Sequence, residues 1–349
     1  MNTNKPLKIC ALRLTALGDC INAFGFLQSV QINNPKAELL WVIDKRFSSL
    51  FRDSEGHDLI PMVEVDFKKG LLKGILELGR KLKGQHFDLL LNLQTSLKAS
   101  LCSLKISANL KYGYDRFRSR ELQCLFVNRR VTSPNNPHVL SGFLAFGKQS
   151  GLGDLTPCWD FKLSEQELSP FKKLLHRKKI FTICPASAKP YKNWTVEGYA
   201  AVALYAKEQG FDIVLTGGNK DSEIKLCADI EQKIEGQCTN LCGKTSLREL
   251  ACVISLSCVV LSPDSAALHL SSALNIPVIG LFAVHNPKRV GSWNYPQLWV
   301  SVYNDLARKE LGAKKQIPWR YRVKNPEAMK QISIESVKDA FDRAIELTF

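Results

Sequence analysis

The alternation of short apolar runs with amphipathic stretches, which continues along almost the whole chain, most constrains the fold. In the first half this pattern predicts strands at 9–14, 39–44, 87–93 and 125–131, and helices at 20–32 and 138–151. Successive strands separated by helices pair in parallel, because each helix carries the chain back across a face of the sheet. We therefore expect a parallel sheet with helices on both faces.

The same pattern starts again near residue 179. Here it predicts strands at 179–185, 211–218, 258–263 and 277–282, and helices at 195–210, 220–234, 246–255 and 265–274. A polar, lysine-rich segment at 164–179, SEQELSPFKKLLHRKK, lies between the two halves and is expected to be the linker. The sequence thus predicts an α/β protein with two Rossmann-like domains, residues 1–175 and 176–332, whose sheets face each other across a central cleft. The last helix, 333–349, is expected to pack back on the first domain.

Charge and cysteine content narrow the possible partners and the compartment. Lys and Arg outnumber Asp and Glu by 48 to 33, a formal charge of +15. This excess suits nucleic acid, an anionic membrane surface or a phosphorylated substrate, although a solvated basic face without a partner is equally compatible. No nucleic-acid-binding motif accompanies the charge, so nucleic acid is not expected. The eleven scattered cysteines, the absence of a signal-peptide pattern in MNTNKPLK and the absence of a membrane-length apolar run predict a cytoplasmic protein with reduced thiols.

Three common catalytic patterns are missing. The turn after the first strand, TALGDC, lacks the G-x-G-x-x-G of dinucleotide-binding folds. The GKT at 243–245 lacks the upstream glycine of a P-loop, and no G-x-S-x-G elbow occurs. The six histidines are scattered, so no metal triad is expected.

The first predicted turn carries a carboxylate where such folds usually hold a phosphate. Its single glycine, Gly18, is followed at once by Asp19 at the start of the helix. Aspartate is a good helix N-cap, and that structural role is one interpretation. The other is a general base, since a carboxylate at this turn is ionised at neutral pH and is stabilised by the helix N-terminus.

In the second half, further chemically active residues follow predicted strands. They are Lys192, Asp264, Ser265, His269 and the segment 286–293. Each has a structural alternative: Asp264 as an N-cap, Lys192 as a solvated surface lysine, and His269 as a core histidine bonded to backbone. Because ligands of parallel sheets bind at the carboxyl ends of the strands, we expect these residues and Asp19 to face one cleft.

Two long segments resemble the heptosyltransferases of glycosyltransferase family 9. LRLTALGDCINAFGFLQSV is similar to the family's R-x-S-A-x-G-D motif, and SPDSAALHLSSALNIPVIGLFAVHNPKRVGSW is similar to its second motif. The intervening GYDRFRSRELQCLFVNRRV, KNW and NLCGKTSLRELACVI also fit, so the resemblance covers nearly the whole chain. The chain departs from the family pattern at Pro263, at Ala266 and in FAVHNP.

The resemblance implies a GT-B fold, with the acceptor on the first domain and the donor on the second. It implies inverting transfer of heptose from ADP-heptose to the Kdo region of lipopolysaccharide without a metal or another cofactor. Asp19 would be the base and Lys192 would stabilise the leaving group. The resemblance places the donor at Ser187, Lys192, Glu223, Asp264, Ser265, Ala266 and His269. The basic block DRFRSREL suggests the acceptor site, at Arg116, Arg118 and Arg120.

The resemblance also implies a protein peripheral to the inner membrane, because its acceptor, Kdo–lipid A, lies in the inner leaflet. DRFRSREL and the helix at 138–151 are most similar to enzymes that add the first heptose. Two other functions stay open: a family-9-like transferase using another nucleotide sugar, and a non-catalytic polyanion-binding protein. The sequence does not determine the Kdo number, the phosphorylation of the acceptor or the oligomeric state.

Overall fold

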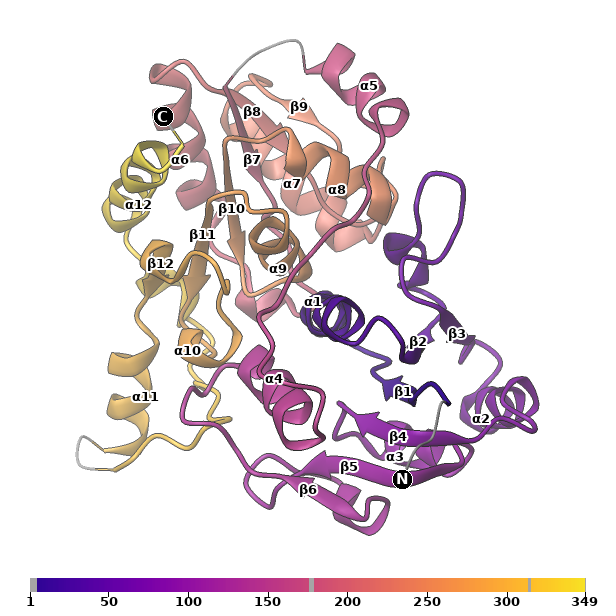
Figure 1. The fold of residues 1–349 in the computed structure, drawn as a ribbon. Helices are drawn as coiled ribbons and strands as arrows, with labels where there is room; N and C mark the ends of the chain where they lie inside the picture. Colours follow the sequence, from indigo (N-terminus) through magenta and orange to yellow (C-terminus); the bar gives the residue numbers. More distant parts are fainter. Residues whose placement is uncertain (1–4, 176–178, 313–314, 349) are drawn as a thin grey trace. The chain divides into compact units, whose positions relative to one another are not determined.

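The computed structural model describes residues 5–175, 179–312 and 315–348 (Figure 1). The chain divides into two compact units, an amino-terminal unit of residues 1–162 and a carboxy-terminal unit of residues 163–349. Each unit has its own sheet and its own hydrophobic core. The α/β prediction with two parallel sheets is confirmed.

The described residues of the amino-terminal unit contain a six-stranded parallel sheet. Its strands are β1 (Lys8–Leu12), β2 (Glu38–Asp44), β3 (Met62–Val65), β4 (Phe87–Asn92), β5 (Ala108–Tyr114) and β6 (Arg129–Val131). They lie in the order β3-β2-β1-β4-β5-β6, and the register aligns Leu12 with Val42 on one side and with Asn92 on the other. This is the strand order of a doubly wound nucleotide-binding sheet.

Helices cover both faces of this sheet. They are α1 (Leu17–Asn33), α2 (Leu71–Lys81), α3 (Leu97–Ser103) and α4 (Val139–Gln149), with short 3₁₀ turns η1 (Ser48–Phe51) and η2 (Gln123–Leu125). On one face, α1 and α4 contact each other, and Phe24 of α1 stacks over Trp41 of β2. On the other, Ile75 and Leu78 of α2 share a buried cluster with Cys102 of α3.

The carboxy-terminal unit repeats the same plan. Its described strands are β7 (Ile180–Ile183), β8 (Asp212–Leu215), β9 (Thr239–Asn240), β10 (Val259–Pro263), β11 (Val278–Phe282) and β12 (Trp299–Ser301). They form a parallel sheet in the order β12-β11-β10-β7-β8-β9. Counted from β7, this is the order of the first sheet, so the two units are two copies of one topology.

The helices of this unit again lie on two faces. They are α5 (Glu165–Leu174), α6 (Val196–Glu208), α7 (Asp221–Lys233), α8 (Leu247–Ser255), α9 (Ala266–Ala273), α10 (Pro287–Val290), α11 (Tyr303–Leu311) and α12 (Ile334–Glu346). Short 3₁₀ turns join them at η3 (Pro190–Lys192), η4 (Pro296–Leu298) and η5 (Met329–Gln331). One core joins the sheet to α6, α7 and α12, and α8 packs against α5 and α9.

The last helix packs on the carboxy-terminal unit, which corrects the expectation that it returns to the first domain. Phe341 of α12 contacts the rings of Phe181 and Phe211, with ring centroids 4.8 and 5.2 Å apart. Asp342 accepts a hydrogen bond from the hydroxyl of Tyr205 on α6 at 2.9 Å. The apolar stripe of the helix therefore completes the core of its own unit, and residue 349 lies outside the described residues.

The segment expected as the linker is mostly helix α5, so the boundary lies at 162/163 rather than at 175/176. Ser164 and Glu167 form a capping box that starts this helix. Glu167 also accepts two hydrogen bonds from Arg248 on α8, at 2.7 and 2.8 Å, which attaches α5 to the second unit. Residues 176–178 of the expected linker lie outside the described residues.

Other differences concern short elements. The strand expected at 125–131 is confined to Arg129–Val131, because η2 and a turn precede it. Four strands and five helices of the described chain were not predicted from the sequence. They are β3, β5, β9, β12, α2, α3, α5, α10 and α11. The strands are edge or near-edge strands with mixed burial, so they lack the continuous apolar run that marks a central strand.

In each sheet the strand order reverses between two neighbouring central strands, β1 and β4 in the first and β7 and β10 in the second. The chain leaves these neighbours in opposite directions, which opens a crevice at their carboxyl ends. Residues after β1 and β4, and after β7 and β10, are therefore the first places to examine for a site. Among the described residues, no helix has both the length and the apolar character needed to cross a membrane.

Candidate functional site

Asp19 lies at the crevice of the amino-terminal sheet, in the first turn of α1 directly after β1. The N-cap of this helix is Ala16, so the N-cap interpretation of Asp19 does not describe its position. About a third of the side chain, 32%, remains exposed. The carboxylate therefore reaches solvent while its backbone is fixed by the helix.

Arg13, at the end of β1, holds the Asp19 carboxylate. Its Nη2 donates a hydrogen bond to Oδ2 of Asp19, and its Nη1 donates to the carbonyl of Leu93 at 2.6 Å. The guanidinium is buried, and Phe143 of α4 lies beneath it at 5.6 Å from the ring centroid. Because the second oxygen of Asp19 accepts no hydrogen bond from any described residue, it is available to accept a proton.

Gln94, just after β4, fixes the turn that precedes Asp19. Its Oε1 accepts hydrogen bonds from the backbone N–H groups of Leu14 and Thr15, at 2.8 and 3.0 Å. The two central strands of the sheet are thus joined at their carboxyl ends. The sequence analysis selected neither Arg13 nor Gln94, although Arg13 stands at the arginine of the quoted R-x-S-A-x-G-D pattern.

In the carboxy-terminal unit, Lys192 and Asp264 meet at the crevice between β7 and β10. Lys192 ends η3 after β7, and Asp264 follows β10. The Lys192 ammonium donates to the backbone carbonyl of Asp264 and lies 3.1 Å from its Oδ2. Both side chains are largely buried, at 13% and 14% exposed, so Lys192 is not a solvated surface lysine.

His285 completes this cluster from the chain after β11. Its Nδ1 donates to Oδ2 of Asp264 at 2.6 Å, and 19% of its side chain is exposed. The sequence analysis did not select His285, although it lies in FAVHNP, where the chain departs from the family pattern. That departure from the pattern is the only signal that could have identified it.

The environment of Asp264 keeps its carboxyl ionised. Burial by itself would raise the pKa of Asp264, but the hydrogen bond from His285 and the charge of Lys192 outweigh burial and hold this pKa well below its usual range. The ring of His269, when charged, acts in the same direction. An ammonium has three protons to donate. One goes to the backbone carbonyl of Asp264, and the ammonium also lies 3.1 Å from the Asp264 carboxylate, so Lys192 can still donate to an anion.

The start of α9 lies beside this cluster. Ser265 is its N-cap and accepts from the N–H of Ala267 at 3.2 Å, so Asp264 is not the cap. The hydroxyls of Ser265 and Ser262 are 2.7 Å apart. Ala266 is the first residue of the helix, and His269 is buried one turn further along it. A helix start with free N–H groups is a favourable place for an anion.

Ser187 supports the loop that carries Lys192. Its backbone N–H donates to the side-chain carbonyl of Asn193 at 2.8 Å, and its hydroxyl donates to the carbonyl of Lys189 at 2.7 Å. The side chain is buried. Ser187 is therefore placed to shape the loop around Lys192, directly after β7.

Glu223 lies at the neighbouring strand rather than in the Lys192–Asp264 cluster. It stands in the first turn of α7, and its Oε2 accepts from the N–H of Gly218, after β8, at 2.8 Å. A Cβ at Gly218 would lie 2.9 Å from that oxygen, so only glycine permits this approach. Lys220 lies 3.5 Å from the other carboxylate oxygen. The site residues of this unit thus occupy the ends of adjacent strands.

The three arginines proposed for the acceptor separate into two kinds. Arg118 is buried and donates to the carbonyls of Asn136 and His138, at 3.1 and 3.5 Å, and burial lowers its pKa. It holds the loop together and is not exposed to a ligand. Arg116 and Arg120 are exposed on the same loop, after β5.

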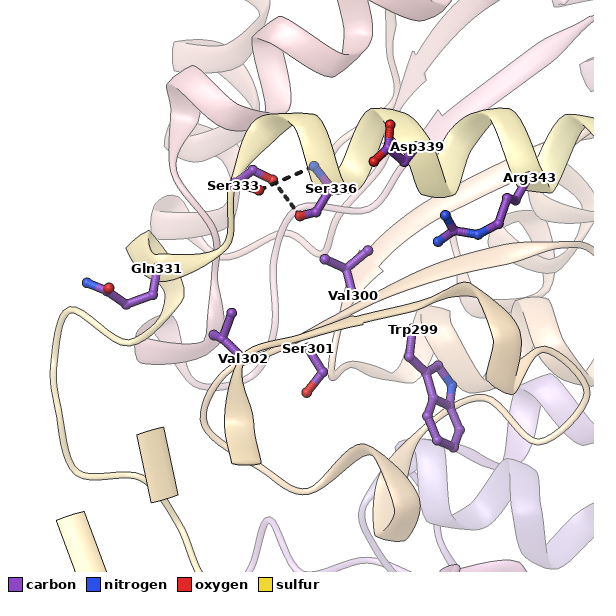
Figure 2. Close-up of a pocket in the computed structure, with 9 residues that line it drawn as sticks. All are labelled: Trp299, Val300, Ser301, Val302, Gln331, Ser333, Ser336, Asp339 and Arg343. Atoms are coloured by element: carbon purple, nitrogen blue, oxygen red, sulfur yellow. Dashed lines mark hydrogen bonds between the residues drawn. The ribbon is translucent and has the colours of Figure 1, made fainter. Parts of the chain in front are cut away.

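A hollow in the carboxy-terminal unit lies elsewhere in the fold. Figure 2 shows it between β12 and the first turns of α12, with a volume of about 320 Å³. Ser333 and Ser336 hydrogen-bond to each other at its wall. It lies at the edge strand of the sheet, and its lining includes none of the residues selected from the sequence. The hollow is therefore separate from the candidate site residues of this unit.

Within residues 5–175, 179–312 and 315–348, no group of three His, Cys, Asp or Glu side chains is placed to hold a metal ion.

The chain is similar to known proteins over most of its length. A family model described as glycosyltransferase family 9 (heptosyltransferase) matches residues 75–319. The chain is 37% identical over 337 residues to the lipopolysaccharide core heptosyltransferase OpsX of Haemophilus influenzae, with 96% of each chain covered. It is 21% identical to lipopolysaccharide heptosyltransferase 1 of an Escherichia coli O18:K1:H7 strain, covering 89% of this chain and 96% of that protein.

Solved structures share the fold. The crystal structure of a family 9 glycosyl transferase from Veillonella parvula superposes with a TM-score of 0.78 at 20% identity, covering 98% of both chains. The structure of E. coli heptosyltransferase WaaC with ADP gives a TM-score of 0.72 at 18% identity, covering 97% of this chain and 100% of that one.

Proposed function

The chain belongs to glycosyltransferase family 9, the heptosyltransferases, and from this premise we propose that it transfers a heptose from ADP-heptose to the inner core of lipopolysaccharide. Its fold is GT-B, two Rossmann-like units. Relatives described as lipopolysaccharide heptosyltransferases support the proposed reaction, as does the ADP in the WaaC structure. The amino-terminal unit would bind the acceptor, and the carboxy-terminal unit would bind the donor.

The observation that carries this proposal is the Asp19 carboxylate, which the buried Arg13 holds at one oxygen and whose side chain is 32% exposed. The acceptor hydroxyl must lose its proton as its oxygen attacks the anomeric carbon, and Asp19 would take that proton. The bond between the anomeric carbon and the phosphate oxygen breaks with both electrons going to ADP. Attack on the face opposite ADP inverts the anomeric carbon. A positioned base of this kind typically contributes ~10²–10⁴ in rate.

Lys192 and the start of α9 would stabilise the departing diphosphate. Lys192 donates one hydrogen bond to the carbonyl of Asp264 and can still donate to an anion, and the α9 helix starts with the N–H groups that favour an anion. Asp264 and His285 keep the ammonium in place. Positive charge from this side chain is the proposed substitute for a metal ion in the transfer.

The remaining expected residues would bind the two substrates. Glu223, at the end of β8, is the proposed contact for the donor ribose, because a carboxylate accepts hydrogen bonds from hydroxyl groups. Arg116 and Arg120 are the proposed contacts for the carboxylates and phosphates of Kdo–lipid A. Arg118 would act only by holding their loop. Since the acceptor is a lipid of the inner membrane, the protein would act at the cytoplasmic side of that membrane.

Substitution of Asp19 by Asn tests the proposal. Asn keeps the shape and accepts the Arg13 hydrogen bond but is not a base, so we expect transfer from ADP-heptose to Kdo–lipid A to fall by ~10²–10⁴, read by product mass. ADP affinity, measured by calorimetry, should stay within about twofold. Asp154→Asn, at an exposed ion pair of the same unit, is the matched control and should transfer normally.

Two results would contradict the proposal. Normal transfer by Asp19→Asn would remove Asp19 as the base. Stronger competition by UDP- or GDP-sugars than by ADP-heptose, in the same binding assay, would assign the donor to another nucleotide.

A further inference from the structure

Helix α2 of the amino-terminal unit exposes a row of leucines. Leu72 and Leu76, one turn apart, are 75% and 55% exposed, and Leu71 beside them is 40% exposed. The opposite side of the same helix is already used, because Ile75 and Leu78 are buried against the sheet and α3. Helices on the surface of a globular protein normally carry polar residues on the outer side. Helix α2 instead carries apolar residues on its inner side and on its outer side.

Cations surround these leucines. From residue 68 to residue 83 the sequence has six Lys or Arg and one acid, Glu77, which gives a net charge of +5 (six minus one). Glu77 is paired with Lys81 at 2.8 Å. The other five cations form no ion pair with the described residues and are all exposed, at Lys68, Lys69, Lys73, Arg80 and Lys83. We call Leu71, Leu72, Leu76 and these five cations the α2 face.

Side-chain and backbone contacts connect the α2 face to a second exposed apolar segment. Lys98, on α3, lies 4.0 Å from the ring centroid of Phe67, which precedes α2. The N–H of Leu97, next to it, donates to Glu121 at 2.6 Å in the loop after β5. That loop exposes Phe117 and Leu122, at 89% and 63%. The apolar residues therefore follow the carboxyl edge of the first sheet, the edge at which Asp19 also lies.

We propose that the α2 face is the surface by which this protein docks on an anionic lipid bilayer. Exposed leucines together with exposed lysines and an arginine on the same segment fit the interfacial region of such a bilayer, because the leucines enter the acyl boundary while the cations reach the phosphates. A protein partner fits less well, because lysine is depleted at protein interfaces. The inference rests on the proposed function, since it names how the protein reaches a lipid acceptor.

The position of the face on the fold supports this partner. The first residues of the face, from Lys68 to Leu72, follow β3 and lie at the same edge of the sheet as the proposed base, whereas Arg80 and Lys83 lie toward the opposite edge, before β4 begins. Docking through the start of α2 would bring the Asp19 edge to the headgroups. Arg116 and Arg120, on the loop that exposes Phe117, add positive charge to the same rim. A bilayer bound here would present its headgroup sugars to the Asp19 crevice.

Co-sedimentation of the full chain with vesicles tests the proposal. We expect binding to vesicles of phosphatidylcholine with about a third phosphatidylglycerol to be at least about tenfold stronger than to phosphatidylcholine alone, and to weaken with added salt. Leu72→Gln/Leu76→Gln and Lys69→Gln/Lys73→Gln should each lower the vesicle affinity at least about tenfold. Controls in the other unit, Leu174→Gln/Leu347→Gln, each 51% exposed, and Lys309→Gln/Lys315→Gln, remove the same number of exposed groups and should change the vesicle affinity less than twofold.

A second readout separates this proposal from the proposed function. Transfer to a deacylated, water-soluble Kdo acceptor should be unchanged in the α2-face variants, whereas transfer to acceptor in vesicles should fall with the binding. Normal vesicle binding by both variants, or equal binding to both vesicle types, would overturn the docking surface even if soluble transfer is normal. Absence of all transfer with intact vesicle binding would instead contradict the proposed function.

One further outcome would assign the face to a second copy of the chain. If light scattering shows a dimer that Leu72→Gln/Leu76→Gln converts to a monomer, the leucines are covered by protein in solution and the bilayer proposal fails. Circular dichroism of each variant identifies misfolding, and the lysine variant, which changes only exposed side chains, tests the proposal independently of the leucines.

Discussion

Replacement of Asp264 by Asn tests the electrostatics of the cluster that Lys192, Asp264 and His285 form. The carboxylate accepts from His285 Nδ1 at 2.6 Å and lies 3.1 Å from the Lys192 ammonium. At 3.1 Å and an effective dielectric constant of about 20, the attraction to Lys192 is about 5 kcal/mol, partly offset by the cost of removing both charges from water. Asn keeps the volume but leaves a buried ammonium without its counter-charge. We expect a loss of about 3 kcal/mol in the free energy of unfolding at pH 7.

The pH dependence of this loss follows from the pKa of Asp264, which lies below its usual 3.8 in the folded protein. A carboxyl with a depressed folded pKa stabilises the fold fully above its unfolded pKa, and this stabilisation is lost as the pH falls through the unfolded and then the folded value. The difference in the free energy of unfolding between wild type and Asp264→Asn should therefore be constant above about pH 5 and become smaller below about pH 4.

Thermal unfolding by calorimetry measures the effect. For a unit of this size, about 3 kcal/mol corresponds to a fall of about 6–12 °C in the Tm of the carboxy-terminal unit. Asp305→Asn, at an exposed position of α11 in the same unit, is the control and should change the free energy of unfolding by less than about 0.5 kcal/mol. A Tm of Asp264→Asn equal to that of wild type at pH 7 would refute this role of Asp264. So would a difference in the free energy of unfolding that is as large at pH 3.5 as at pH 7.

Three further predictions concern packing, an ion pair and thiol reactivity. Gly25→Ala places a Cβ 2.2 Å from the ring of Trp159, so it should lower the free energy of unfolding by about 1–3 kcal/mol and change the tryptophan fluorescence. The control Gly79→Ala, on α2, faces a flexible lysine and should leave urea unfolding unchanged. Arg248→Met removes the ion-pair partner of Glu167 and should lower the free energy of unfolding by about 2 kcal/mol at pH 7. The hydrogen bond from Arg248 lowers the pKa of Glu167 in the folded protein, so the loss should be smaller below pH 4, where Glu167 is protonated in the unfolded chain. Burial raises the pKa of the Cys102 and Cys184 thiols to about 12. Both thiols should therefore resist iodoacetamide at pH 8 in the folded protein and react with it in urea, as measured by peptide mass. Rapid labelling in buffer without urea would contradict their burial.

The sequence alone determined the parallel sheets and the positions of the main site residues along the chain. Apolar periodicity is a local property, so it identifies central strands and the turns after them. Asp264 follows β10 directly, and Asp19 and Lys192 lie in the segments that come after β1 and β7, which is why the sequence could place all three near the carboxyl ends of strands. The family motifs were equally readable, because they consist of contiguous residues.

Only the tertiary structure decided which of these residues meet and which do not. His285 reaches Asp264 across 21 positions of the chain, because β11 lies beside β10, and no local pattern encodes that contact. Arg118 is buried while Arg116 and Arg120 are exposed, a difference set by the carbonyls of a distant loop. Helices α5 and α12 are attached to the second unit by contacts between residues far apart in the chain, such as Glu167 with Arg248 and Phe341 with Phe181. Such contacts depend on strand order and packing, which arise only when distant segments are brought together.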